Sequence, residues 1–187
     1  MRRKKPTQRE IDTAYHEAGH AVMSYWLHIG FRHVTIERGE DSLGHVRMHE
    51  RRTFWDEAET TSRNMQNEMS GALMTQIRRE ILVLLSGPAA AQIRHGKDYA
   101  PGGGGDGSDR AVALDLAICV CGEEREALNY REWLCTRAQN VLSYSPLWYA
   151  VQRLAERLLE CRTLKSRDAR KVIQDALRDS LVTQKAP

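Results

Sequence analysis

Residues 14–21 read Ala-Tyr-His-Glu-Ala-Gly-His-Ala and contain the pattern His-Glu-x-x-His. On a helix, His16 and His20 lie one turn apart, so both imidazoles project from the same face. Two neutral imidazoles suit Zn²⁺, which takes nitrogen ligands at roughly 2.0–2.1 Å. Glu17 follows the first histidine, where a carboxylate can take a proton from a water molecule at such a metal. The stretch therefore predicts a helical zinc centre in which His16 and His20 bind Zn²⁺ and Glu17 is the catalytic base.

The surrounding residues favour a helix that buries one side and turns its histidines the other way. Thr7 and Glu10 form a predicted capping box, and the helix is expected to run to about Leu27. The simpler alternative is a solvated helix with two exposed histidines, but the position of Glu17 favours the zinc centre. The expected apolar stripe lies on nearly the opposite side from the histidines and consists of Ile11, Ala14, Tyr15, Ala18, Val22 and Tyr25.

The composition is that of a soluble, globular chain. Of the 187 residues, 41% are hydrophobic and 28% charged, and a net charge of +3 is too small to indicate a nucleic-acid partner. No apolar run is long enough for a membrane span, and no apolar segment follows the basic N-terminus, so we expect no membrane anchor and no signal peptide. The simplest interpretation of the four cysteines is then that they are free thiols, which indicates a protein of the reducing cytoplasm. We expect a disordered basic arm at residues 1–6 and a single domain at residues 7–187.

A β-hairpin is expected directly after the first helix. Residues 33–37 are rich in β-branched side chains, residues 38–44 indicate a turn, and residues 45–48 form a candidate return strand. A strand edge beside a zinc helix can hold an extended peptide by backbone pairing. We therefore predict that the hairpin is a substrate-docking edge; the alternative is a hairpin that only covers the core. The predicted substrate-binding residues are Val34, Ile36 and Val46.

The rest of the chain is predicted to be helical, so the expected fold is mainly α with one small β-hairpin beside the first helix. The pair Gly87-Pro88 is expected to interrupt the second long helix, because proline inside a helix kinks or ends it. Residues 102–105 are four glycines without the Lys-Ser/Thr of a phosphate loop, which argues against nucleotide binding. The expected helices, from apolar residues at a spacing near 3.6, cover about residues 68–94, 106–129, 132–142, 147–160 and 166–181.

A catalytic zinc centre needs a third protein ligand beside the two histidines. Trp26, six residues after the second histidine, cannot bind a metal, so the ligand must come from elsewhere in the chain. The sequence offers four candidates around the glycine-rich loop, namely His95, Asp98, Asp106 and Asp109.

Four stretches of the sequence resemble the peptidase domain of the FtsH-type ATP-dependent zinc proteases. Residues 14–22 are similar to the family's Y-H-E-A-G-H-A motif, and residues 34–44 are similar to its V-T-I-x-P-R-G…L-G hairpin. Residues 81–93 resemble its L-L-G-G-R-A-A-E-E segment, and residues 107–117 resemble A-S-N-D-x-x-x-A-T-x-x-A. The likeness covers about residues 8–178.

The resemblance implies a ligand set and an assembly. The family's third zinc ligand is the aspartate that corresponds to Asp109, with Asp106 as the second choice, and its peptidase domains form hexameric rings. The family's ATPase domain and membrane anchor have no counterpart in the sequence, so a separate ATPase is the expected source of any unfolding activity. Ala91 and Gln92 stand in place of a pair of glutamates. The resemblance therefore implies that a carboxylate which would orient a zinc ligand by a hydrogen bond is missing here.

The sequence therefore predicts a cytoplasmic zinc metalloendopeptidase that hydrolyses peptide bonds of unfolded or flexible proteins. One alternative is a non-catalytic zinc-binding relative that serves as a structural or interaction module. Another is a regulatory protease that cuts one dedicated partner. The presence of Glu17 favours an enzyme, because a structural zinc centre has no use for that carboxylate.

Overall fold

The structure is a computed structural model that describes residues 5–37, 45–48, 71–96 and 106–183. Within these ranges the fold is mainly helical with a small antiparallel β-hairpin beside the first helix, as predicted. The elements in chain order are α1 (Gln8–Trp26), β1 (Phe31–Thr35), β2 (His45–Met48), α3 (Gly71–His95), α4 (Asp106–Cys121), α5 (Glu124–Leu142), α6 (Ser145–Cys161), β3 (Thr163–Lys165) and α7 (Ser166–Thr183).

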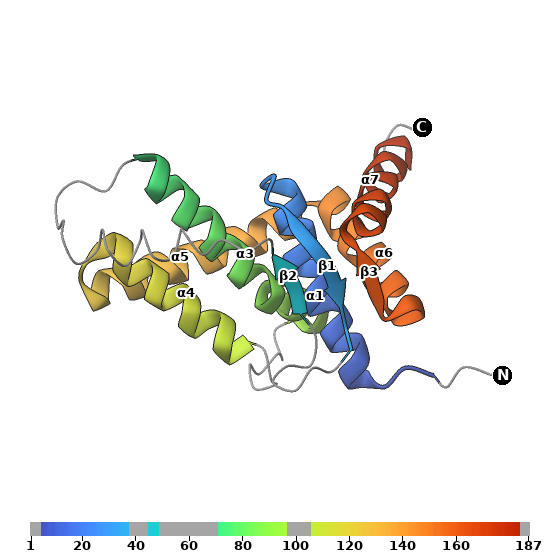
Figure 1. The fold of residues 1–187 in the computed structure, drawn as a ribbon, viewed down its shortest axis with the longest axis horizontal. Coiled ribbons are helices and arrows are strands. Elements are labelled where there is room, and N and C mark those ends of the chain that lie inside the picture. Colours follow the sequence, from blue (N-terminus) through green and yellow to red (C-terminus); the bar gives the residue numbers. More distant parts are fainter. Residues whose placement is uncertain (1–4, 38–44, 49–70, 97–105, 184–187) are drawn as a thin grey trace.

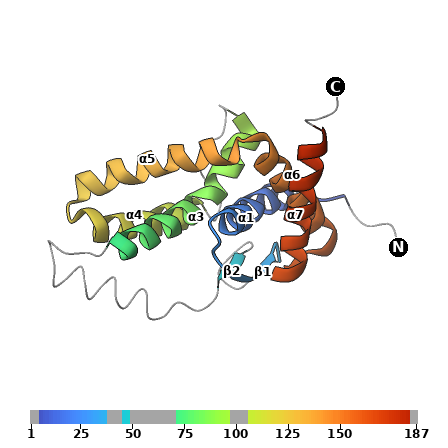
Figure 2. The same cartoon turned by 90° about the horizontal axis from the view of Figure 1, so that it is seen from above.

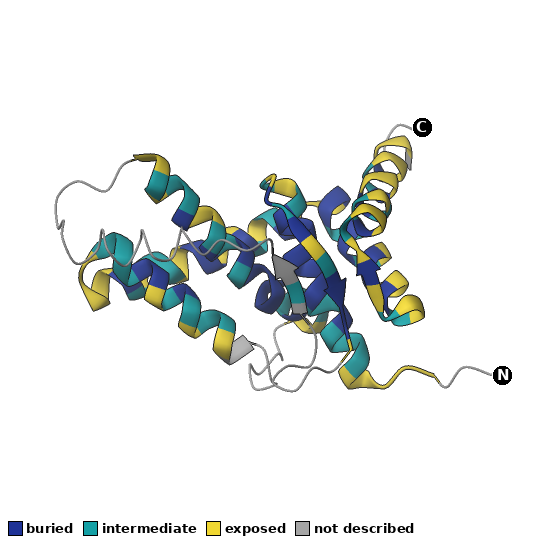
Figure 3. Ribbon diagram, in the orientation of Figure 1, coloured by how far each residue is buried: buried dark blue, intermediate teal, exposed yellow. Residues whose placement is uncertain are grey.

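Helix α1 lies at the centre of the molecule. Figures 1 and 2 show it between a group of three helices, α3, α4 and α5, and the pair α6 and α7. It packs against both α3 and α6, while α4 and α5 pack on α3 and on each other, and α7 packs mainly on α6. The central position explains why α1 is buried over most of its second half, including Glu17 and His20 (Figure 3). The alternative of two solvated histidines is therefore wrong for His20, which is only 7% exposed.

The start of α1 is closed by the predicted capping box. The Oγ1 atom of Thr7 accepts a hydrogen bond from the Glu10 backbone N–H, and the Glu10 carboxylate accepts one from the Thr7 backbone N–H at 2.7 Å. Glu10 also forms an ion pair with Arg162, at 2.6 Å, in the turn between α6 and β3. The hydrogen bonds from Thr7 and Arg162 lower the pKa of Glu10 to about 2. The first turn of α1 is thus attached to a segment that is remote in the sequence.

The hairpin belongs to a sheet of three strands in the order β2-β1-β3, and β3 was not expected from the sequence. Val34 on β1 pairs with Val46 on one side and with Leu164 on the other. The backbone N–H of Ile36, just after β1, donates a hydrogen bond to the carbonyl oxygen of Arg162. Val34 and Ile36 are both buried. Val34 is therefore not on an open edge of the sheet, because a strand paired on both sides has no free backbone groups for a peptide. Val46 lies on β2, the neighbouring strand.

Two predicted helix boundaries are also corrected. Helix α3 continues through Gly87-Pro88 to His95, because tertiary packing of its small residues on α1 outweighs the loss of one backbone hydrogen bond at proline. The single helix expected at residues 106–129 is instead two helices, α4 and α5. Gly122 separates them with a positive φ of 74°, the left-handed conformation that commonly ends a helix.

No helix in the described ranges is both long enough and apolar enough to cross a lipid bilayer.

Candidate metal centre

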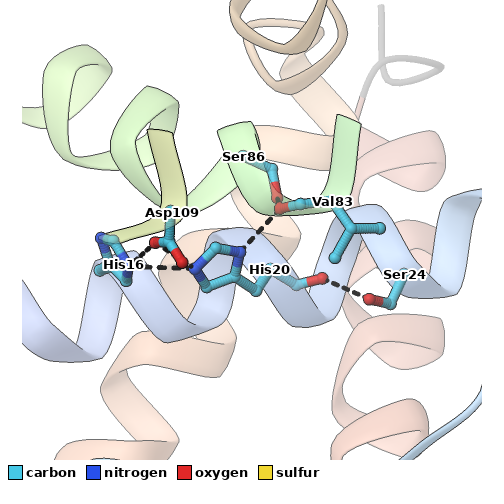
Figure 4. A network of polar contacts seen from close by, with 6 residues as sticks. All are labelled: His16, His20, Ser24, Val83, Ser86 and Asp109. Atoms are coloured by element: carbon cyan, nitrogen blue, oxygen red, sulfur yellow. Dashed lines mark hydrogen bonds and ion pairs between the residues drawn. The ribbon is translucent and has the colours of Figure 1, made fainter. Parts of the chain in front are cut away.

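Three potential metal ligands converge where α1 faces the beginning of α4. Nε2 of His16 and Nε2 of His20 lie 3.0 Å apart, and Oδ2 of Asp109 lies 2.9 Å from the first and 3.2 Å from the second (Figure 4). These are the only three His, Cys, Asp or Glu residues in the described ranges that form such a group. Ligand atoms of a tetrahedral zinc ion are roughly 3.3 Å apart, given the bond lengths of zinc to nitrogen and oxygen. The triangle formed by Nε2 of His16, Nε2 of His20 and Oδ2 of Asp109 is therefore close to the size that Zn²⁺ requires.

The structure separates the four candidates for the third ligand. Asp109 reaches the histidines from the first turns of α4, at the position that the family resemblance implies. His95 is turned to a different partner, since its Nε2 lies 2.9 Å from Oδ1 of Asp12. Asp106 begins α4, and Asp98 lies outside the described residues.

The ring of His20 is oriented by the backbone of α3. Its Nδ1 donates a hydrogen bond to the carbonyl oxygen of Val83 at 2.7 Å, so Nε2 faces Asp109 and His16 and is the nitrogen that carries the metal-binding lone pair when the ring is neutral. The Oγ atom of Ser86 donates a second hydrogen bond to the same carbonyl oxygen, at 2.5 Å. A backbone group thus does what a carboxylate does behind many zinc-binding histidines. Sequence reasoning missed it, because a carbonyl oxygen is common to every residue.

Ala91 and Gln92, which stand where the FtsH-type motif has two glutamates, both lie in α3. Ala91 is buried in α3, and the Oε1 atom of Gln92 accepts a hydrogen bond from Nε2 of Gln139 at 2.6 Å. Gln92 therefore contacts α5. The histidine ring that could be oriented by a carboxylate is held instead by Val83.

Glu17 is buried beside the triangle, with 5% of its surface exposed. Burial raises the pKa of its carboxyl group by disfavouring the charged form, while the charges of His20 and His16 act in the opposite direction. A carboxylate with a raised pKa is a stronger base than one in water and a better proton donor once it is protonated. Both properties suit a group that must accept and then return a proton.

Asp109 has the opposite electrostatic behaviour. Burial alone would raise its pKa, but the charge of His20 and the hydrogen bonds from both histidines outweigh this effect. The net pKa of Asp109 is therefore well below its ordinary value, so the group is an anion at neutral pH. An ionised carboxylate is the form that binds a metal.

Two glycines lie at the contact of α1 with α3. A Cβ atom on Gly19 would lie 2.5 Å from the carbonyl oxygen of Ser86 and 2.7 Å from Cβ of Ala90. A Cβ atom on Gly87 would lie 2.3 Å from Nε2 of His20 and 2.7 Å from Nε2 of His16. The backbone of α3 thus forms one wall of the site. The sequence signal was the run of small residues around Gly87-Pro88, which we interpreted as a helix interruption.

The three predicted substrate-binding residues do not form one group at the site of His16, His20 and Asp109. Val34 and Ile36 belong to the core, whereas Val46 lies on β2 and is partly buried against the core. Strand β2 lies at one side of the sheet of described strands, and both strands of the hairpin contact α1.

No protein-family model matches the chain, and no curated protein matches it either.

Proposed function

We propose that the chain is a zinc metalloendopeptidase that hydrolyses peptide bonds in unfolded or flexible proteins. The observation that carries this proposal is the convergence of His16, His20 and Asp109 to within 3.2 Å of one another, with the buried carboxyl group of Glu17 beside them. The donor set is two nitrogens and one carboxylate oxygen, which is a typical ligand set of catalytic zinc centres. The resemblance to FtsH-type peptidase domains supports the same conclusion.

The residues divide the chemistry between them. A zinc ion bound by His16, His20 and Asp109 would polarise the scissile carbonyl and increase the acidity of a water molecule. A carboxylate oxygen of Glu17 accepts the proton of the attacking water and then gives it to the nitrogen of the leaving amine. Val83 keeps His20 in the tautomer whose Nε2 is free to bind.

Burial of Glu17 supports an enzyme over the alternative of a non-catalytic zinc module. A buried carboxyl group lowers stability unless its surroundings compensate for the lost hydration. Retention of such a group next to a metal triangle is expected where it serves in proton transfer. A regulatory protease with one dedicated partner would use the same residues, and a substrate screen separates it from a general endopeptidase.

The wider setting follows from the same proposal. The four cysteines are free thiols, in keeping with a reducing compartment such as the cytoplasm. By analogy with FtsH-type proteases, we propose that the domain assembles as a homo-hexamer and that a separate ATPase delivers folded substrates. The chain alone would then cut flexible peptides and unfolded proteins without ATP.

A test of the proposal combines metal analysis with hydrolysis of unfolded casein. The wild-type chain should bind about one zinc per chain and cleave casein, and a chelator should stop cleavage. Glu17→Gln should retain zinc and fold while losing at least about a hundredfold in turnover, the usual contribution of a general base. His20→Ala should lose both zinc and turnover. Zinc binding without any cleavage by the wild type would favour the non-catalytic module.

A further inference from the structure

Gly87 is a buried residue in the interior of α3, at the wall of the proposed metal centre. Glycine in the middle of a helix is less favourable than alanine, because its backbone loses more freedom on folding. Gly87 is not among the residues with positive φ, so its backbone conformation does not require glycine. The reason for a glycine at this position must therefore lie in the space around its Cα atom.

That space is occupied by the metal-binding ends of two imidazoles. The nearest atoms to an added Cβ are Nε2 of His20, at 2.3 Å, Cε1 of His20, at 2.6 Å, and Nε2 of His16, at 2.7 Å. All three distances are far shorter than a van der Waals contact. The two nitrogens are also the atoms that lie 2.9 and 3.2 Å from Oδ2 of Asp109.

We infer that Gly87 is a positioning residue of the metal centre: its missing side chain leaves the space in which Nε2 of His16 and Nε2 of His20 meet Asp109. The inference rests on the proposed zinc site and assigns to it a residue that binds no metal itself. The α3 wall then has two parts, the carbonyl oxygen of Val83, which holds Nδ1 of His20, and Gly87, which leaves room for Nε2 of the same ring.

Gly19 provides the structural contrast within the same helix contact. A Cβ atom on Gly19 would strike the backbone of Ser86 and the side chain of Ala90, and neither can move without separating the two helices. A Cβ atom on Gly87 would strike the ends of two side chains that can rotate away. Alanine at position 19 should therefore disturb the fold, whereas alanine at position 87 should mainly displace the imidazoles.

The test measures metal binding and stability separately in Gly87→Ala and the wild type. Zinc affinity is obtained by competition with a chromophoric chelator, and Co²⁺ supplies a visible spectrum that reports the geometry of the ligands. We expect Gly87→Ala to bind zinc about 10–100-fold more weakly or worse, the range found when groups that orient metal ligands are removed. Its Co²⁺ spectrum should differ from that of the wild type, and the melting temperature of the metal-free protein should stay constant or rise.

Gly71→Ala is the matched control, because it makes the same change in the same helix where an added Cβ meets nothing within 4 Å. It should leave zinc affinity and the Co²⁺ spectrum unchanged. Equal zinc affinity of Gly87→Ala and the wild type would overturn the inference and leave the proposed metal centre standing. A wild type that binds no zinc would overturn both.

If Gly87→Ala fails to fold, a second background still shows whether the imidazoles are the reason that glycine is required. In the background His16→Ala/His20→Ala the rings that an alanine at position 87 would strike are absent. If Gly87→Ala unfolds the wild type but is tolerated in this background, the imidazoles are the atoms that require glycine. If it unfolds both proteins, the requirement comes from the helix packing and the inference is wrong.

Discussion

Nδ1 of His20 lies 2.7 Å from the carbonyl oxygen of Val83, so the imidazole ring on α1 is oriented by the backbone of α3, the helix that packs against it. Ser24 adds a bond within α1, where its Oγ donates to the carbonyl oxygen of His20 at 2.7 Å. The orientation of the His20 ring is thus tied to the packing of α1 on α3. Any change that keeps this packing should keep the ring in place.

The first prediction follows from the fact that the Val83 acceptor is a backbone atom. Val83→Ala removes two buried methyl groups and should lower the free energy of unfolding by about 2 kcal/mol. Zinc affinity should change by less than about threefold, because the carbonyl oxygen remains. Urea unfolding and a zinc competition assay measure the two effects. A large loss of zinc affinity without loss of stability would show that the Val83 side chain, and not its carbonyl group, supports His20.

The second prediction distinguishes the two aspartates at the start of α4. Asp109→Ala should lower zinc affinity by more than about a hundredfold, because losing a metal ligand costs more affinity than losing a group that only orients a ligand by a hydrogen bond. Asp106→Ala is the matched control, three residues away on the same helix, and should keep zinc affinity near that of the wild type. Loss of zinc in Asp106→Ala alone would mean that the third ligand is Asp106.

The positions of the histidine pair and of Asp109 differ in how far the sequence can predict them. His16 and His20 are four residues apart, so local helix geometry alone places their rings on one face. Asp109 is 93 residues from His16, and its position depends on how α4 packs against α3. The residues left four candidates open, and only the family resemblance pointed to Asp109.

The sheet shows a second limit of sequence patterns. The hairpin was predictable because its two strands are close in the sequence and the first is rich in β-branched residues. Strand β3 has three residues and pairs with β1 across a separation of more than 120 residues, as in the contact of Thr35 with Thr163. No local pattern reveals such a pairing, and it is what turns β1 from an edge into an inner strand.

The third prediction concerns the pH dependence of the attachment at the start of α1. The pKa of Glu10 is lowered from 4.5 to about 2, so its stabilising contribution is present above about pH 4.5 and is lost as the pH falls towards 2. Glu10→Gln should lower the melting temperature of the metal-free protein slightly at pH 6, because the group is exposed and solvent screens its interactions. The difference between variant and wild type should shrink as the pH falls from about 4.5 through 2. A difference that does not shrink over this range would contradict the assignment.

The fourth prediction tests the corner between α4 and α5. Gly122 has a φ of 74°, and an added Cβ would meet nothing within 4 Å, so Gly122→Ala introduces backbone strain alone. The cost should be about 1 kcal/mol in the free energy of unfolding. Gly122 lies thirteen positions after Asp109, roughly 20 Å along α4, so zinc affinity should be unchanged. An increase in stability would indicate that a continuous helix from α4 into α5 is the preferred conformation.

The last prediction returns to substrate docking, now restricted to β2. Strand β1 is paired on both sides, so Val34→Ala should act on the core, lowering the free energy of unfolding by about 2 kcal/mol without changing KM for a short peptide. If a substrate pairs with the backbone of β2, its affinity depends on alternate N–H groups of the substrate, because successive N–H groups of a strand point to opposite sides. Single N-methylation along a cleavable peptide should therefore raise KM at alternate positions and have little effect between them. The unmethylated peptide is the control, and Val46→Ala should alter KM only modestly, since backbone pairing does not need that side chain. A uniform effect of methylation at every position would argue against strand pairing and favour a hairpin that only covers the core.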